Sequence, residues 1–446
     1  MPPTSRRRHA RQPLRKNQGG YALIVLLAIV TMGILYSIVS ALTPMQAKYQ
    51  QSATTQDALR QAKEALIAYA VSVNLSSGAA RLGDLPCPDL HDQSTSSAGK
   101  KGTSCGNAAG TTGQSNRLGL LPWKDLGLPE LRDGSGEHLW YAVSSNFKEN
   151  TRVSKRNSDT PGTISIKAND GTVYDSTVIA VIIAPGAPIT RADGYVQSRS
   201  TTGIPNPKDY LDIDTASGED NAAFQDNGSD GFISGPIRDG TGTLVTNDQV
   251  ITITYNDLMP VLQKRVAQEI LNCLSGYAAD PDNSGRYPWM ASLADSAAQG
   301  SSAFYNDSAN TRFGRFPSDL TNTNASRSSM SKNWGSVANC NMSGGNSWFT
   351  TDWSEMVFIA IASAFTPSSA TAGPCAAGSC LTVGSKTGIK TVVLVSGKTL
   401  LGQSRGTSAA MLNIGNYLEG DNATPLDDVF STGVSTATYN DYVLFQ

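Results

Sequence analysis

Histidine and charged residues are scarce in this sequence. The chain has 446 residues, of which three are histidines and 16% are charged. The net charge is −2, so the chain as a whole offers no positive field to hold nucleic acid. The histidines are His9, His91 and His138, and a Ser-His-acid site would need one of them beside a nucleophile. This scarcity predicts a non-enzymatic protein that binds no nucleic acid.

Two short catalytic motifs are present only in part. Residues 402–406 match the G-x-S-x-G pattern around Ser404, but that pattern requires a later histidine and none follows residue 138. Residues 396–399 resemble the end of a phosphate-binding loop, but Val392 stands where its first glycine should be. Both segments are more simply explained as turns near strands.

The segment from Tyr21 to Leu42 is uncharged and almost wholly apolar. As a helix it spans about 33 Å, the thickness of a hydrocarbon core. The basic residues before it predict a cytoplasmic N-terminus and an exported remainder. A plain signal anchor also fits this pattern. The basic residues are Arg6, Arg7, Arg8, Arg11, Arg15 and Lys16.

The junction before this segment resembles the leader of a type IV prepilin or pseudopilin. Lys16 to Gly20 reads Lys-Asn-Gln-Gly-Gly, and the apolar run begins at Tyr21. The resemblance covers residues 15 to about 75. It implies cleavage between Gly20 and Tyr21 by a prepilin peptidase, followed by N-methylation. It also implies that the first helix packs against other pilins or pseudopilins, through residues that include Leu23, Ile24, Val25, Leu27, Ile34 and Leu35.

One position departs from the family pattern. The fifth mature residue is usually Glu, and here it is Val25. A carboxylate within a membrane costs a few kcal/mol, and the family keeps it to pair with the N-terminus of a neighbouring subunit. A subunit at the filament tip has no such neighbour ahead of it, so Val25 resembles a tip-like, minor subunit. A subunit that docks in a different way is the alternative.

An even number of cysteines in an exported chain predicts disulfide bonds. Six cysteines allow fifteen pairings. Short loops favour Cys87 with Cys105 and Cys375 with Cys380, which leaves Cys273 with Cys340. A zinc site is the alternative, but Cys375 and Cys380 have no second close pair or nearby histidine.

From residue 65 onward, the chain contains two similar sets of sequence segments in the same order. Strand-like runs bounded by Gly, Pro, Asn and Asp recur in both copies. A helix of about 257–279 opens the second copy, since Leu258, Leu262, Val266 and Ile270 recur at helical spacing. The matching segments are 65–70 with 273–278, 83–87 with 285–289, 117–122 with 312–317, 139–143 with 356–360, 178–183 with 391–395, 210–222 with 417–423, and 247–250 with 440–443.

These patterns predict an α+β fold. Residues 1–20 form the leader, and 21–78 form a long pilin-like helix whose first part, 21–42, is transmembrane. The amphipathic stripe after the membrane includes Met45, Tyr49, Leu59 and Leu66. Residues 79–250 form a first pilin-like head of helix plus antiparallel sheet, and 251–446 form its duplicate.

Acidic loops are the remaining candidate for chemistry. Asp220, Asp226 and Asp230 crowd one loop, and calcium prefers several oxygen ligands at such spacings. No stretch fits a twelve-residue EF-hand loop, and Asp-rich turns explain the same pattern. No cofactor is predicted, with calcium left as the open alternative.

Together these observations predict a minor pilin or pseudopilin at a filament tip, which takes part in assembling a type IV pilus or a type II secretion pseudopilus. Its predicted partners are other pilins or pseudopilins, a prepilin peptidase and the inner membrane. The predicted location is the inner membrane, single-pass with periplasmic heads, and then the filament or cell surface. The alternative is an inner-membrane-anchored periplasmic or surface adhesin or receptor with two binding heads.

Overall fold

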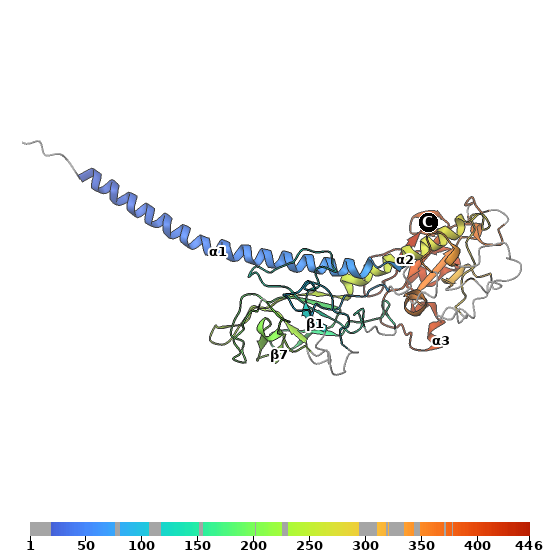
Figure 1. Ribbon diagram of the computed structural model, residues 1–446. Helices are drawn as coiled ribbons and strands as arrows, with labels where there is room; N and C mark the ends of the chain where they lie inside the picture. The colour runs from blue at the N-terminus through green and yellow to red at the C-terminus, as the bar shows by residue number, and fades with distance from the viewer. Residues whose placement is uncertain are drawn as a thin grey trace, which may run out of the picture. The chain divides into compact units, whose positions relative to one another are not determined.

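The structure is a computed structural model in which the chain divides into two compact units, residues 1–54 and 55–446. The helices are α1 (Gly19–Val71), α2 (Tyr255–Ala279) and the short α3 (Ser408–Met411), and the strands described form six small sheets (Figure 1). The residues described are 19–75, 81–106, 117–150, 155–200, 202–224, 231–293, 310–317, 320, 334–342, 348–369, 372–376 and 378–446.

The first four-stranded sheet has the order β1-β2-β5-β11 and is antiparallel throughout. Valine, isoleucine and aromatic residues, which suit a pleated surface, dominate its central strands. β2 and β5 are buried at every position, so both faces of this sheet are covered. Its strands are β1 (Leu118–Leu120), β2 (Trp140–Val143), β5 (Ala180–Ala184) and β11 (Gln249–Ile253).

Different hydrophobic clusters cover the two faces of the first sheet. Tyr141 of β2 belongs to the cluster that contains Leu59 and Leu66 of α1. The preceding residue, Trp140, belongs to a second cluster with Phe232. Because neighbouring side chains on a strand point to opposite faces, one strand contributes to both clusters. The sheet is therefore the central layer between a helix and a loop-rich layer.

The second four-stranded sheet has the order β12-β13-β16-β18 and is also antiparallel. Helix α2 packs against β16 and β18 through a buried stripe that includes Leu258, Leu262 and Val266. At its start the Thr254 amide donates to Asp257 Oδ2 at 2.8 Å, which satisfies one backbone N–H at this end of the helix. The prediction of this helix is confirmed. The strands are β12 (Phe313–Arg315), β13 (Val357–Ile361), β16 (Thr391–Val395) and β18 (Tyr442–Phe445).

Four smaller sheets carry the remaining strands. In the first half of the chain, up to about residue 250, β3 pairs antiparallel with β4 and parallel with β8. In the second half, which follows it, β14 pairs antiparallel with β15 and parallel with β17. Two-stranded hairpins are formed by β6 with β7 and by β9 with β10. Their bounds are β3 (Ile164–Lys167), β4 (Val173–Val178), β6 (Ile213–Asp214), β7 (Glu219–Asp220), β8 (Gly231–Ile233), β9 (Ile237–Arg238), β10 (Leu244–Thr246), β14 (Leu381–Val383), β15 (Lys386–Ile389) and β17 (Val429–Phe430).

The two halves of the chain share this arrangement of strands. Each has a four-stranded antiparallel sheet with the same strand order, and a three-stranded sheet with one parallel pair. The repeated sequence segments fall on equivalent strands, so that β1, β2, β5 and β11 correspond to β12, β13, β16 and β18. β11 runs across residue 250, the predicted boundary between the heads.

A buried ion pair and a backbone hydrogen bond join the two halves. Arg81 donates from Nε and Nη2 to the two carboxylate oxygens of Asp352, both at 2.6 Å. The amide of Arg156 donates to the same Asp352 at 2.9 Å, and its guanidinium lies 2.5 Å from Asp84. Burying these charges is tolerable only because each is paired. They help to make residues 55–446 one compact unit.

The amphipathic stripe predicted for the first helix is correct only in part. Leu59 and Leu66 are buried in the core of the second unit. Met45 and Tyr49, by contrast, are 70% and 76% exposed. They precede the part of α1 that begins at Thr55 and belongs to the second unit. The helix therefore buries its apolar face over a shorter length than the sequence pattern predicts.

The predicted fold class and location are wrong as stated. In the part of the chain that the structure describes, no helix is long and apolar enough to cross a membrane. This corrects both the transmembrane helix of 21–42 and the single-pass inner-membrane location. One physical reason is that Gln46, Lys48, Gln50 and Gln51 of α1 are polar and exposed, so the described part of this helix offers no long apolar run. The heads are also not single antiparallel sheets, since the fold is mixed α/β with several small sheets and two parallel pairs.

Candidate functional site

The predicted processing site lies at the start of α1. Gly20 and Tyr21 are the second and third residues of this helix, and the side chain of Tyr21 lies outside the described residues. The same holds for five of the six predicted packing residues, namely Leu23, Ile24, Val25, Ile34 and Leu35. The sixth, Leu27, is 64% exposed.

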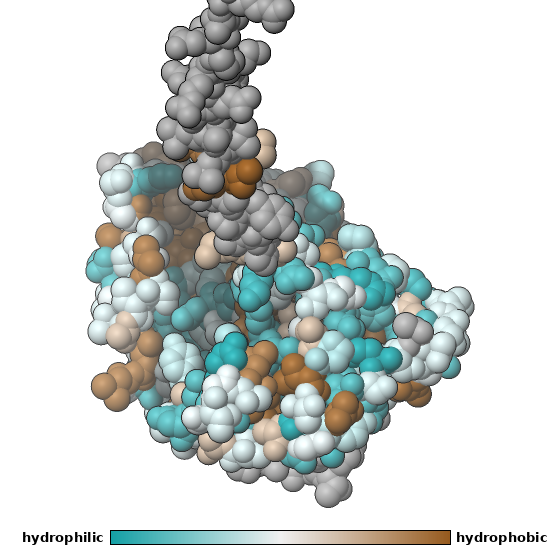
Figure 2. All heavy atoms as spheres, turned by 90° about the vertical axis from the view of Figure 1, so that its left-hand side faces the viewer, coloured by the Kyte–Doolittle hydropathy of each residue, from teal (hydrophilic) through white to brown (hydrophobic). Residues whose placement is uncertain are grey.

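Exposed apolar side chains recur along the first part of α1. Burying one such side chain contributes about 1.5–3 kcal/mol, so a series of them favours contact with a partner. On the face shown in Figure 2, by contrast, hydrophobic residues are scattered among hydrophilic ones, as is normal for a protein surface. The exposed apolar residues of this helix are Leu27, Ile29, Val30, Met32, Met45 and Tyr49.

All six cysteines are disulfide-bonded, in the two pairs that loop length favours and the one pair that remains. Cys87 bonds to Cys105, Cys273 to Cys340, and Cys375 to Cys380. The zinc alternative is excluded for these residues because none has a free thiol. Disulfides of this number indicate an oxidising compartment.

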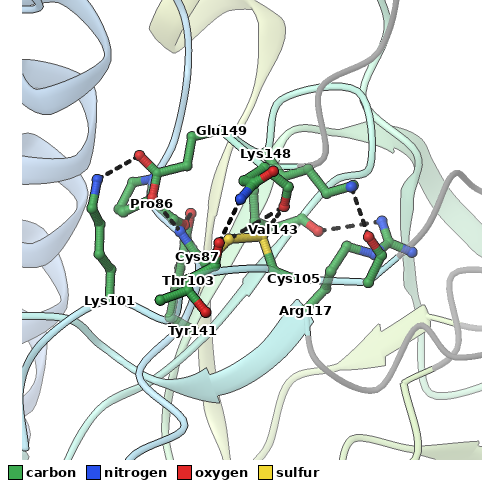
Figure 3. Close-up of a disulfide and its surroundings, with 12 residues drawn as sticks. Pro86, Cys87, Lys101, Thr103, Cys105, Arg117, Tyr141, Val143, Lys148 and Glu149 are labelled. Carbon is green, nitrogen blue, oxygen red and sulfur yellow. Dashed lines mark hydrogen bonds and ion pairs between the residues drawn. A yellow bond between two sulfur atoms is a disulfide. The ribbon is translucent and has the colours of Figure 1, made fainter.

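The disulfide Cys87–Cys105 anchors a loop against the first sheet (Figure 3). Within this loop Lys101 donates to Glu149 Oε2 at 2.6 Å. Tyr141 of β2 donates to the carbonyl of Pro86 at 3.1 Å, next to the first cysteine. The loop between the two cysteines is therefore held at both ends and again at Lys101, near its second cysteine.

This anchored loop forms one wall of a cavity of about 410 Å³. Gln93 and Ala98 line it from the loop, and the segments 120–138 and 199–210 supply the other walls. The volume lies within the usual range of small-molecule sites, about 300–1,000 Å³. The cavity combines aromatic, apolar and charged side chains, which makes it a candidate binding site.

Glu130 is the centre of one charged group in the cavity. His138 Nε2 lies 2.6 Å from Glu130 Oε1, and Arg132 also pairs with this oxygen. Burial opposes ionisation of Glu130, but Arg132 and His138 prevail and lower the pKa of the carboxyl below its ordinary value. Glu130 therefore stays ionised over the physiological range.

Arg199 and Glu137 form the second charged group. Arg199 Nε lies 3.4 Å from Glu137 Oε1. The guanidinium also donates to the carbonyls of Asp209 and Gly186 and lies 4.6 Å above the ring of Tyr210. Because these contacts hold Arg199 from several sides, its position is fixed without a ligand.

The acidic loop considered as a calcium alternative is described only in part. Asp220 lies 2.7 Å from Nη2 of Arg191, so its charge is already paired. Asp226 and Asp230 lie outside the described residues. In the ranges that the structure describes, no group of three or more metal-binding side chains occurs.

Sequence reasoning missed a pair of buried carboxylates in each half. In the first half, Asp248 Oδ2 accepts from the amide of Asp212 and from Asn221 Nδ2, both at 2.8 Å. Gln197 donates to Asp212 at 2.9 Å, and the amide of Asn247 donates to it at 2.6 Å.

The second half repeats these contacts. Asp441 Oδ2 accepts from the amide of Glu419 at 3.0 Å and from Asn422 Nδ2 at 2.9 Å. Gln403 donates to Glu419 at 2.8 Å, and the amide of Asn440 donates to it at 3.0 Å. The sequence signal for these pairs was the repeat of the Tyr-Leu-acid, Asp-Asn-Ala and Asn-Asp motifs in both halves. A motif by itself does not show which other motif its carboxylate contacts.

The paired carboxylates have shifted acidities. Burial raises the pKa of Asp212 to about 6, and burial together with Asp212 raises that of Asp248 well above its ordinary value. In the second half, burial and the neighbouring Glu419 raise the pKa of Asp441 to about 8. Since two adjacent buried carboxylates resist ionising together, each pair holds a proton near neutral pH.

The cavity residues were also missed, although one signal was available. The segment 123–138 is denser in charged residues than the chain as a whole and contains Trp123 and His138.

Comparisons with models of protein families, with curated proteins and with solved structures found no match for this chain.

Proposed function

We propose that this chain is a non-enzymatic minor subunit of a filament of the type IV pilus or type II secretion pseudopilus kind. The observation that carries the proposal is the series of exposed apolar residues on α1. It starts a few residues after the Gly20–Tyr21 junction and includes Leu27, Met45 and Tyr49. A helix that leaves such residues uncovered gains most by packing against equivalent helices of other subunits.

Two further features support a minor, tip-like subunit. Val25 replaces the glutamate that pairs with the subunit ahead. The second unit, residues 55–446, is also large for a subunit repeated at close spacing along a thin filament. The three disulfides fit an exported protein.

The non-enzymatic part of the proposal rests on the histidines. His91 Nδ1 lies 2.8 Å from Asp89 Oδ1, and His138 Nε2 lies 2.6 Å from Glu130 Oε1. The hydrogen bonds of these two imidazoles in the described residues go to carboxylate or carbonyl oxygens and not to a hydroxyl or thiol nucleophile, and His9 belongs to the predicted leader. An adhesin or receptor whose heads bind an exposed polymer is the second candidate, and the cavity of the first half favours it.

The test uses sheared filaments from cells that express the full chain with its assembly machinery. Tyr49→Ser combined with Met45→Ser removes apolar contacts outside the second unit. We expect the double variant to fall at least tenfold in the filament fraction, while its thermal midpoint stays unchanged. N-terminal sequencing of the wild-type protein in that fraction is expected to begin at Tyr21.

Tyr174→Ser is the matched control, because Tyr174 is 85% exposed but lies on β4 of the second unit. It should enter filaments like the wild type. Normal incorporation of the double variant, or a mature N-terminus other than Tyr21, would contradict the proposal.

A further inference from the structure

We propose that the cavity of the first half binds an uncharged sugar residue of a polysaccharide or glycan. This inference goes beyond the filament role and does not depend on it. Its basis is the chemistry of the cavity walls: an aromatic surface, fixed planar polar groups on several sides, and charges that are already paired.

The aromatic surface is Trp123, which is partly exposed and lines the cavity. The loop backbone at Gly99 packs closely against its indole ring, and a Cβ there would come within 2.4 Å of Trp123 Cε2. Gly99 also has a φ of +81° and donates its amide to Asp89 Oδ2 at 2.6 Å. Lys124 Nζ also lies 4.9 Å from the centre of this ring, so a pyranose would stack its C–H face on the part of the ring that Gly99 and Lys124 leave uncovered.

The planar polar groups are the carboxylates and guanidinium groups on the other walls. Glu130 and Glu137 offer acceptor oxygens, while Arg132 and Arg199 offer donors. A sugar carries several hydroxyls, and each of them can donate one hydrogen bond and accept others. Side chains of both kinds around one cavity of about 410 Å³ match that pattern.

The charges of the cavity are balanced internally. Glu130 pairs with Arg132 and His138, and Glu137 pairs with Arg199. Because these lining charges already have partners, a charged ligand would lose hydration without meeting an uncompensated charge of opposite sign among them. An uncharged ligand can instead bond to the free lone pairs and N–H groups while the pairs remain intact.

The site is also organised before any ligand arrives. Arg132 Nη1 donates to the carbonyl of Gly136 at 2.7 Å, and Arg199 Nη2 donates to that of Gly186 at 3.0 Å. The disulfide Cys87–Cys105 holds the loop that carries Gly99. Preorganised groups lose little conformational entropy on binding, which favours recognition of a small, flexible hydroxylated ligand.

The test is a binding titration of the intact protein by calorimetry and saturation-transfer NMR. The probes are neutral oligosaccharides of glucose, galactose, mannose and N-acetylglucosamine, together with a uronic-acid oligosaccharide and a sulfated one. We expect at least one neutral probe to bind. Trp123→Ala should weaken that binding at least tenfold, and the exposed control Tyr174→Ala should leave it unchanged.

Glu137→Gln is the second variant, and it keeps the shape of the side chain if Trp123→Ala disturbs the fold. It should weaken binding about tenfold while the thermal midpoint stays near that of the wild type. Three results would overturn the proposal: no neutral probe binds, only the acidic probes bind, or Glu137→Gln binds like the wild type.

Discussion

Buried carboxylates are the least expected residues of this chain. Asp248 and Asp441 each lie beside a second carboxylate, Asp212 and Glu419 respectively, in equivalent places of the two halves. Amide and side-chain N–H groups surround each pair and compensate part of the cost of burial. The remaining cost is avoided when one carboxyl of the pair keeps its proton.

This arrangement predicts a pH-dependent stability. Burial and Glu419 raise the pKa of Asp441 to about 8, so the folded protein holds a proton that the unfolded chain releases at about pH 4. The free energy of unfolding should therefore be highest in mild acid and fall by a few kcal/mol as the pH rises towards 8. Urea unfolding at several pH values measures this slope.

Asp441→Asn mimics the protonated carboxyl and should flatten the slope. Asp421→Asn is the control, because Asp421 is an exposed carboxylate close in sequence but outside the pair. An unchanged slope in Asp441→Asn would show that this carboxyl is already ionised in the folded protein.

Covalent links act on particular elements. Cys273 is buried in α2, and its bond to Cys340 closes a loop with a sequence separation of 67. The bond between Cys375 and Cys380 closes a loop with a separation of only 5. A longer closed loop restricts the unfolded chain more and so stabilises the folded state more.

The loop lengths predict unequal effects of removing the two disulfides. Replacing Cys273 and Cys340 by alanine should lower the free energy of unfolding by about 4 kcal/mol, against about 2 kcal/mol for Cys375 and Cys380. Chemical denaturation of the two double variants under the same conditions compares them. Equal losses would mean that residual structure in the unfolded chain, rather than loop length, sets the effect.

Across the whole molecule, we expect the ion network between the halves to make them unfold as one body. Asp352 is buried and receives Arg81 and the amide of Arg156, which come from the first half of the chain. Removing it leaves a buried guanidinium without its carboxylate. We expect Asp352→Ala to cost about 3–5 kcal/mol and to split one calorimetric transition into two.

Asp57→Ala is the matched control, because Asp57 pairs with Arg60 at 2.8 Å on an exposed helix face. It should cost less than about 1 kcal/mol. If Asp352→Ala also loses no more than that, the halves are joined by their apolar contacts and not by this network.

Local patterns in the sequence predicted the elements that depend on neighbouring residues. The stripe from Leu258 to Leu274 predicted α2, and short loops predicted the pairs Cys87–Cys105 and Cys375–Cys380. The repeat predicted that β2 and β13 are equivalent strands. These features follow from helical period, strand composition and loop closure, all of which can be computed along the chain.

Tertiary structure alone decided the features that join distant segments. Residues far apart in the sequence meet in the parallel strand pairs β3–β8 and β14–β17. They also meet in the buried pair Asp212–Asp248 and in the cavity between Trp123 and Arg199. The pattern of α1 predicted one amphipathic helix, yet only the packing of residues from Thr55 onward decided which apolar side chains are buried. The hydrophobic period and the composition of the chain determine which helices and strands form. Long-range contacts determine which faces of these elements pack together and which buried carboxyl pairs hold a proton.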